Sequence, residues 1–266
     1  MQLSDTAPLV TSSRDSGIGT VVCNRPPANA MTPEFVDAIV AEVTALGADP
    51  DVRVVVIRSA LERIFMAGAD LGAMNTGLEQ GGRADSVGVL SRKLIAVERL
   101  EKPVIAAISG HALGGGCELA LCCDYRIMVD NDRATIGLTE TSLGLIPGAG
   151  GTQRLPRLIG KGAALKMIIE STRAKAPQAL AMGLVDIIAT PEQFDAAVQS
   201  KAEQLAVLAT RAVGLAKRAV LEGLDTTVDE GLTIESRAFA EALGTEDIRE
   251  GVGAFLEKRK ANFVGR

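Results

Sequence analysis

One acidic residue of this chain lies in an unusually apolar stretch. Residues 109 to 124 read SGHALGGGCELALCCD, where Glu118 stands among leucines, alanines and cysteines. Burying a carboxyl group is costly unless it is hydrogen-bonded or protonated. A helix that begins near Gly115 or Gly116 leaves its first N–H groups without intrahelical partners. Such groups favour a phosphate, a carboxylate or a developing oxyanion, so the stretch indicates an anion site with an acid at its edge.

A second acid lies beside a second glycine-rich turn. Residues 135 to 160 read TIGLTETSLGLIPGAGGTQRLPRLIG, and Glu140 precedes the turn. Two carboxyl groups in one site can divide general acid and general base roles between them. Each also has a structural interpretation, because Glu118 can simply favour a helix dipole and Glu140 can cap a loop.

A third stretch, FMAGADLGAM at residues 65 to 74, carries small residues that let a ligand approach the backbone closely. Asp70 is placed to cap the short helix that follows. The alternative interpretation is an ordinary turn between a strand and a helix.

Other kinds of site find no support in the sequence. There is no P-loop, no G-x-G-x-x-G opening a helix and no G-x-S-x-G elbow. His111 is the only histidine, and the four cysteines form no C-x-x-C pair, so we expect no metal site. The formal net charge of −5 argues against nucleic-acid binding. Without a signal peptide pattern or a long apolar run, and with cysteines typical of a reducing compartment, we expect a cytoplasmic protein without membrane spans.

The elements that position these stretches follow an α/β pattern. Two short β-rich runs around residues 16 and 17 predict a hairpin, and Thr32 followed by Pro33 predicts the start of a helix. Apolar runs at 52–59, 103–110 and 124–129 predict strands that alternate with helices. Residues 75 to 88, rich in glycine and polar residues, predict a mobile segment. From residue 191 onward only helices are expected, and we place the boundary between residues 1–197 and 198–266.

In this order the motifs resemble those of the crotonase family, the enoyl-CoA hydratase/isomerase superfamily. The matching segments are NRPPANAM, FMAGADL, SGHALGGGCELALCCDYRI, ETSLGLIPGAGGTQRLPRLIG, ALAMGLVDII and EGVGAFLEKRKANF. They span nearly the whole chain. The resemblance implies a crotonase-like spiral of ββα turns over residues 1–197 that holds a CoA-thioester site. It also implies a helical C-terminal oligomerisation region over 198–266 that forms a homotrimer, or a hexamer built from two trimers.

The resemblance also implies the chemistry. The substrate would be a coenzyme A thioester, with no separate cofactor. The backbone N–H groups of Ala69 and Gly115 would form the oxyanion hole. As in hydratases of the family, Glu118 would activate a water for attack at C3 of a 2-enoyl thioester, while Glu140 would deliver the proton to C2.

Residues for binding coenzyme A follow from the same resemblance. Lys258 matches a lysine that reaches the phosphate region, typically from a neighbouring subunit, and Lys260, two positions away, is the alternative. The structural interpretation of this run is a solvated basic helix end, which the helix dipole favours. The other candidates are Arg25, Ala28, Ala67, Gly68, Asp70 and Leu71.

Departures from the commonest hydratase pattern leave the acyl group open. Leu138 and Thr139 replace the more usual Gln-Pro ahead of the second glutamate, and His111 stands where an aromatic or aliphatic residue is usual. The alternatives are an enoyl-CoA isomerase, a hydratase for a branched or polyketide-type thioester, an RNA-binding relative and an inactive scaffold. The acidic charge disfavours RNA binding, and the presence of both glutamates disfavours an inactive site.

Overall fold

The larger of two sheets has six strands, in the order β1-β2-β3-β5-β7-β9. The computed structural model describes residues 8–79 and 88–266. β1 and β2 form the predicted antiparallel hairpin, and every later pair of neighbours is parallel. The strand bounds are Val10–Asp15, Ile18–Cys23, Val54–Ser59, Val104–Ile108, Tyr125–Val129 and Ile187–Ala189.

The smaller sheet contains three short parallel strands, in the order β4-β6-β8. These are Ile64–Met66, His111–Leu113 and Ile136–Gly137. Each follows a strand of the larger sheet along the chain, so β3-β4, β5-β6 and β7-β8 are successive turns that place one strand in each sheet. This arrangement confirms the predicted α/β spiral of ββα turns.

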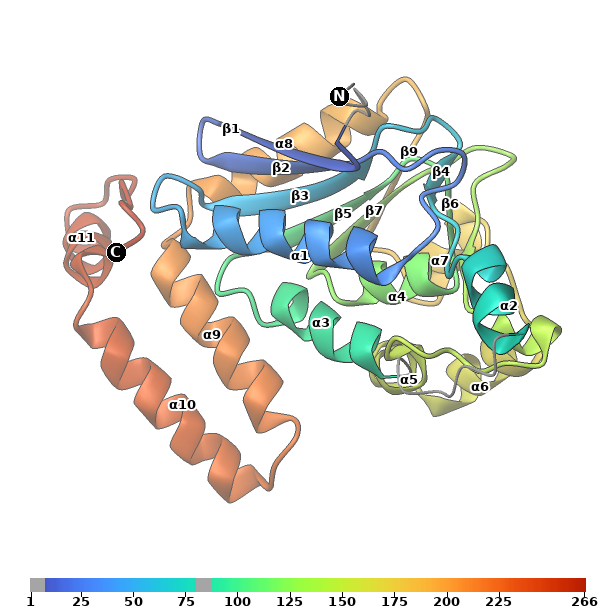
Figure 1. The fold of residues 1–266 in the computed structure, drawn as a ribbon. Helices are drawn as coiled ribbons and strands as arrows, with labels where there is room; N and C mark the ends of the chain where they lie inside the picture. The colour runs from blue at the N-terminus through green and yellow to red at the C-terminus, as the bar shows by residue number, and fades with distance from the viewer. Residues whose placement is uncertain (1–7, 80–87) are drawn as a thin grey trace, which may run out of the picture.

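Helices cover both faces of the larger sheet, as Figure 1 shows. α1 (Pro33–Ala48) packs on β1, β2 and β3 and against α3 (Val89–Glu98), whereas α8 (Phe194–Ala206) contacts β2, β3, β5, β7 and β9. Thr32 caps α1 as predicted, because its side chain accepts a hydrogen bond from Phe35 N. Burial on both faces explains why β3 and β5 are continuous apolar runs rather than alternating ones.

The helices nearest the glycine-rich turns are short. They are α2 (Leu71–Glu79), α4 (Gly115–Leu121), α5 (Gly151–Ile159), α6 (Lys161–Ile169), α7 (Ala176–Ala181) and the 3₁₀ helix η2 (Glu140–Leu143). Every residue of α4 is buried, and a Cβ on Gly116 would lie 2.1 Å from Met66 O, so glycine lets α4 pack directly on β4. Of the segment 75–88 that was predicted to be mobile, residues 75–79 continue α2, and residues 80–87 lie outside the described ranges.

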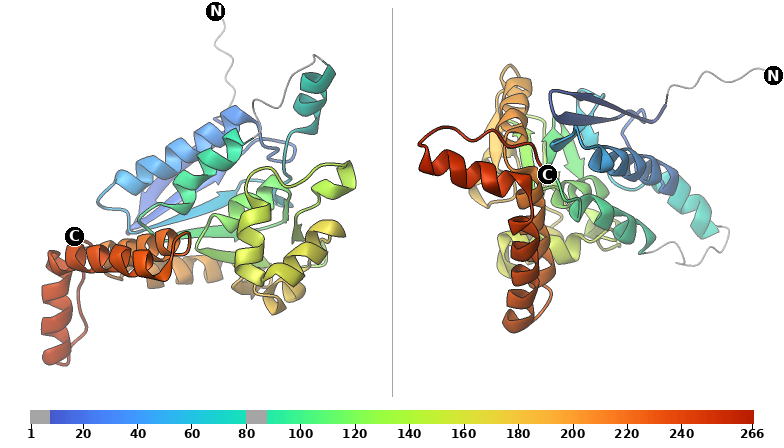
Figure 2. Two further views of the ribbon diagram at one scale, coloured as in Figure 1. Left: turned by 90° about the horizontal axis from the view of Figure 1, so that it is seen from below. Right: turned by 90° about the vertical axis from the view of Figure 1, so that its left-hand side faces the viewer.

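The chain ends in three further helices, α9 (Thr210–Gly223), α10 (Val228–Leu243) and α11 (Glu246–Leu256). α9 and α10 form an antiparallel pair that projects away from the sheets (Figures 1 and 2). The predicted boundary at residues 197 and 198 falls inside α8, which packs on the larger sheet. In the ranges that the structure covers, no helix is long and apolar enough to cross a membrane.

Candidate active site

Two glycine-containing loops meet at the start of α4. A Cβ atom on Gly68 would lie 3.0 Å from Leu113 O and 3.4 Å from Gly115 N. Gly68 has a φ of +96° and Gly114 a φ of +52°, backbone conformations that residues with a side chain rarely adopt. Glycine is therefore required here both for backbone conformation and for close contact. The result is that the loop carrying Ala69 touches the turn that carries Gly115.

Hydrogen bonds fix the direction of two backbone N–H groups in these loops. Met31 N donates to Gly68 O at 2.6 Å, and Glu118 N donates to Gly114 O at 3.0 Å. In a planar trans peptide the C=O and N–H point in opposite directions. The N–H of Ala69 therefore points away from Met31, and the N–H of Gly115 points out of the N-terminus of α4. Two donors on touching loops can stabilise one oxyanion.

Glu118 is almost completely buried, at 2% exposure. Its Oε1 accepts hydrogen bonds from Ala149 N and Gly151 N, each at 2.7 Å. Burial raises the pKa of Glu118, while these two hydrogen bonds and the charge of Arg154 oppose that shift. The second glycine-rich turn thus supplies the partners that allow an acid in this apolar stretch.

Glu140 begins η2 and faces the first glycine turn. A Cβ on Gly114 would lie 3.1 Å from Glu140 Oε1. Glu140 Oε2 is buried and receives no hydrogen bond from the part of the chain that the structure describes. Burial and the negative charge of Glu118 raise the pKa of Glu140 to about 7. One acid is thus anchored, whereas the other has an unpaired oxygen and can hold a proton near neutral pH.

The loop before α2 is held by an ion pair. Arg25 Nη2 donates to Asp70 Oδ2 at 2.8 Å, and Asp70 Oδ1 accepts from Ala73 N, so Asp70 caps α2 as predicted. Ala67 N donates to Ala28 O at 3.1 Å. The structure therefore brings Arg25 and Ala28 together with the 67–71 loop, which carries Ala69.

Comparison with known proteins decides the family. The model of the enoyl-CoA hydratase/isomerase family matches residues 13–266. The chain belongs to the enoyl-CoA hydratase/isomerase family. A crotonyl-CoA hydratase of Syntrophomonas wolfei is 40% identical over 255 residues, which cover 95% of this chain and 96% of the relative. A short-chain-enoyl-CoA hydratase of Clostridium acetobutylicum is 39% identical over 256 residues, 94% of this chain and 95% of the relative.

A solved structure of this family confirms the crotonase fold. The enoyl-CoA hydratase of Bacillus anthracis superposes with a TM-score of 0.88 at 36% identity, covering 97% of this chain and all of that structure. The ββα spiral and the helical C-terminal region predicted from the family resemblance are both present. The acyl group and the roles of individual residues stay predictions.

One residue implied by the family resemblance lies far from the others. Lys258 follows the last residues of α11, at φ +56°, and is exposed. Figure 1 shows α11 at the opposite end of the molecule from α2. Within one chain, Lys258 is therefore not part of the site formed by the 67–71 loop.

The sequence motifs did not indicate how Glu118 is held or what orients the Ala69 peptide. Ala149 and Gly151 bind Glu118 from a turn 31 and 33 residues away along the chain. Met31, which orients the Ala69 peptide, ends the NRPPANAM segment that was noted only for the family resemblance. The PGAGGT turn was a visible signal, but its partner depends on tertiary packing.

The raised pKa of Glu140 predicts a pH-dependent stability. A carboxyl whose folded pKa lies near 7, against an ordinary value of 4.5, stabilises the fold less as pH rises through that window. The free energy of unfolding of Glu140→Gln, relative to that of the native protein, should therefore rise by about 1–2 kcal/mol as the pH goes from about 5 to about 8. This is less than the full linkage value because Glu140 is partly solvated. Urea unfolding at both pH values measures the difference. An equal stability difference at the two pH values would show that Glu140 titrates normally.

Proposed function

We propose that this protein is an enoyl-CoA hydratase that adds water in the syn sense to a trans-2-enoyl-CoA, giving a 3-hydroxyacyl-CoA. The observation that carries the proposal is the contrast between two carboxyl groups beside the Ala69 and Gly115 N–H groups. Glu118 is held by two backbone donors, whereas Glu140 has an unpaired buried oxygen and a pKa near neutral. Such a pair suits one base and one acid.

The proposed reaction begins at the thioester carbonyl. The N–H groups of Ala69 and Gly115 donate to its oxygen, which polarises the conjugated double bond and makes C3 electrophilic. As water adds, negative charge collects on the thioester oxygen as an enolate. Fixed backbone donors stabilise this charge without reorganising.

The two glutamates handle the protons. Glu118, with Oε1 occupied by Ala149 and Gly151, uses its other oxygen to accept a proton from the water that attacks C3. Glu140 gives its proton to C2. A proton transfer from Glu118 to Glu140, directly or through solvent, restores the starting state. Coenzyme A is part of the substrate, and this chemistry needs no separate cofactor.

The isotopic composition of the product tests the proposal against isomerisation. With crotonyl-CoA in ¹⁸O-labelled water, a hydratase places the label in the C3 hydroxyl group, which mass spectrometry detects. An isomerase supplied with a 3-enoyl-CoA moves the double bond and gains no oxygen. Unlabelled 2-enoyl-CoA as the only product, formed from the 3-enoyl substrate, would contradict the hydratase proposal.

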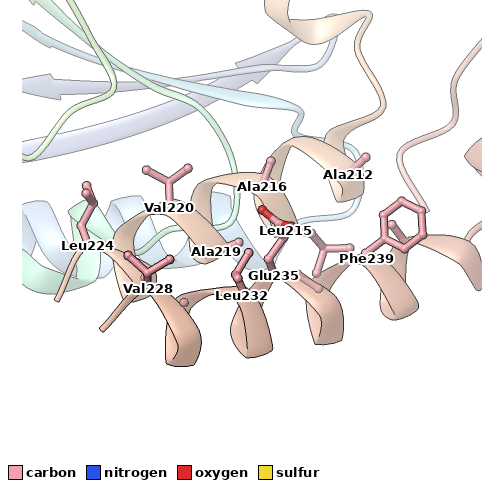
Figure 3. A pocket seen from close by; sticks show the side chains of 14 residues that line it. Ala212, Leu215, Ala216, Ala219, Val220, Leu224, Val228, Leu232, Glu235 and Phe239 are labelled. Carbon is pink, nitrogen blue, oxygen red and sulfur yellow. The ribbon is translucent and has the colours of Figure 1, made fainter. Parts of the chain in front are cut away.

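We also propose that α9 and α10 belong to a homotrimer interface, with the hexamer as a further assembly. A groove of about 540 Å³ runs between the two helices, lined almost entirely by apolar side chains (Figure 3). Val228 is 79% exposed and Leu224 71%. Exposed apolar side chains that lie together on a surface are typical of an interface between proteins. In such an assembly Lys258 would reach the coenzyme A bound by a neighbouring copy of the chain, at that copy's own Arg25 and 67–71 loop. A cytoplasmic location stays a prediction.

A charge in this groove should dissociate the assembly. Phe239 is 65% exposed on α10 and lines the groove. Phe239→Asp is expected to reduce the mass measured by sedimentation velocity from a trimer or hexamer to a monomer, because an unpaired charge would be buried at the interface. Ser236→Asp is the control, since Ser236 is exposed on the same helix outside the groove. A native protein that sediments as a monomer would overturn the proposed interface.

A further inference from the structure

An arginine on α5 ties the Glu118 partners to α3. Arg154 Nε and Nη2 donate to the two carboxylate oxygens of Glu98 at 2.9 and 2.7 Å. The side chains are 12% and 25% exposed, so the pair is largely shielded from water. A two-point contact between guanidinium and carboxylate fixes the orientation of the arginine as well as its position.

The third nitrogen of the guanidinium reaches the 149–151 turn, which holds Glu118. Arg154 Nη1 donates to Ala149 O at 2.9 Å, and Ala149 N donates to Glu118 Oε1 at 2.7 Å. The guanidinium also lies against Gly150, where a Cβ would come within 2.0 Å of Nη1. Gly150, at φ +107°, thus leaves room for the arginine beneath the turn. A continuous path of hydrogen bonds runs from Glu98 through Arg154 and Ala149 to Glu118.

We propose that Arg154, oriented by Glu98, is a positioning residue for the hydration reaction. It holds the 149–151 turn so that two N–H groups converge on one oxygen of Glu118 and leave the other oxygen directed at water. The inference rests on the proposed function, in which Glu118 is the base. It assigns to Arg154 and Glu98 a role through Glu118, without contact with the substrate.

Two substitutions of Arg154 can separate its geometric effect on Glu118 from the effect of its charge. The titratable groups that face it are Arg154 from α5, Cys117 and Cys122 from α4, and Glu140 from η2. Arg154→Lys keeps the positive charge but loses the planar fork, whereas Arg154→Gln removes the charge. The charge of Arg154 opposes the raised pKa of Glu118, so its removal should raise that pKa further.

Kinetics on a 2-enoyl-CoA test the proposal. Arg154→Lys should lower kcat about 10- to 100-fold with KM within about twofold, because the base is misplaced while binding is intact. The acid limb of the pH profile of kcat/KM should move to higher pH for Arg154→Lys, because the two backbone hydrogen bonds that lower the pKa of Glu118 are weakened, and further for Arg154→Gln, which also loses the positive charge. Glu98→Gln should also lower kcat. Combined with Arg154→Lys it should cost no more than the worse single change, since the two residues act as one unit.

A matched arginine controls for stability. Arg126 is buried, pairs with Asp186 and donates to the carbonyls of Leu184 and Cys123, without contact with the 149–151 turn. Arg126→Lys should lower the unfolding temperature to a similar extent and leave kcat within about threefold. Equal loss of kcat in Arg126→Lys and Arg154→Lys would overturn the positioning role, as would native kinetics in Arg154→Lys.

A readout without turnover separates this inference from the proposed function. Infrared difference spectra of the native protein against Glu118→Gln identify the protonated carboxyl of Glu118, and a pH titration follows it. The titration should move to higher pH in Arg154→Lys, which keeps the positive charge but loosens the two hydrogen bonds to Glu118, whether or not the native chain hydrates enoyl thioesters. An unshifted titration would overturn the inference, whereas failure of the proposed function would appear as an inactive native protein.

Discussion

Glu118→Gln is expected to lower kcat for hydration of a 2-enoyl-CoA by about 10³-fold or more. General acid–base catalysis contributes typically 10²- to 10⁴-fold, and no second base faces the same water in the proposed geometry. The glutamine oxygen can still accept from Ala149 N and Gly151 N, so the turn should keep its shape. The amide cannot take the proton that water releases. The measurement is steady-state hydration with the variant and the native protein.

A second buried carboxylate of the chain offers a matched control for this variant. Asp247 is 3% exposed and, like Glu118, accepts two backbone hydrogen bonds, from Val264 N at 2.7 Å and Gly265 N at 2.8 Å. It lies on α11, far from the glycine turns. Asp247→Asn should keep kcat within a few-fold even if stability falls. A loss below about 10-fold in Glu118→Gln would contradict the assignment of Glu118 as the base.

Gly68→Ala should lower kcat/KM by about 10²- to 10³-fold, the usual cost of losing one oxyanion donor. The new Cβ would lie 3.0 Å from Leu113 O and 3.4 Å from Gly115 N, at a φ of +96° that alanine disfavours. Relief of this crowding must separate the two loops. The N–H groups of Ala69 and Gly115 would then no longer converge on one oxygen.

The control for Gly68→Ala is a glycine with the same backbone preference but open surroundings. Gly183 has a φ of +75°, and a Cβ there would meet nothing within 4 Å. Gly183→Ala should lose stability through backbone strain, by about 1 kcal/mol, and keep kcat/KM within about twofold. Similar kinetic losses in both variants would show that strain, rather than the oxyanion donors, explains the effect.

The sequence predicted the larger sheet better than the smaller one. Its central strands have five or six mostly apolar residues, and these patterns were sufficient to place β3, β5 and β7. The strands of the smaller sheet have two or three residues, too few for any periodicity to show. Their place in a spiral was an implication of the family resemblance. Only helices were predicted from residue 191 onward, but the last helix ends at Leu256, and Lys258 follows it in a left-handed conformation.

The candidate site was only half visible from the sequence. The glycines and the acid at Glu118 lie within four residues of one another, so local rules could indicate an anion site. The partners of Glu118 come from the turn at Ala149 and Gly151, and Arg154 finds Glu98 across 56 residues. Such pairings are set by how the spiral turns stack, and no local pattern encodes them. The same holds for the pKa of Glu140, which depends on burial and on the charge of Glu118.

The most direct test of the two-glutamate mechanism is hydration of crotonyl-CoA by the purified native protein. Addition of water removes the conjugation between the double bond and the thioester, so the ultraviolet absorbance of the enoyl thioester falls. The two-glutamate mechanism predicts a rapid fall with the native protein and a rate lower by at least about 10²-fold with Glu140→Gln, which cannot deliver a proton to C2. A rate in Glu140→Gln equal to the native rate would contradict the two-glutamate mechanism. No absorbance change with the native protein, despite tight binding of coenzyme A, would contradict hydration of this substrate and favour isomerisation or another acyl group.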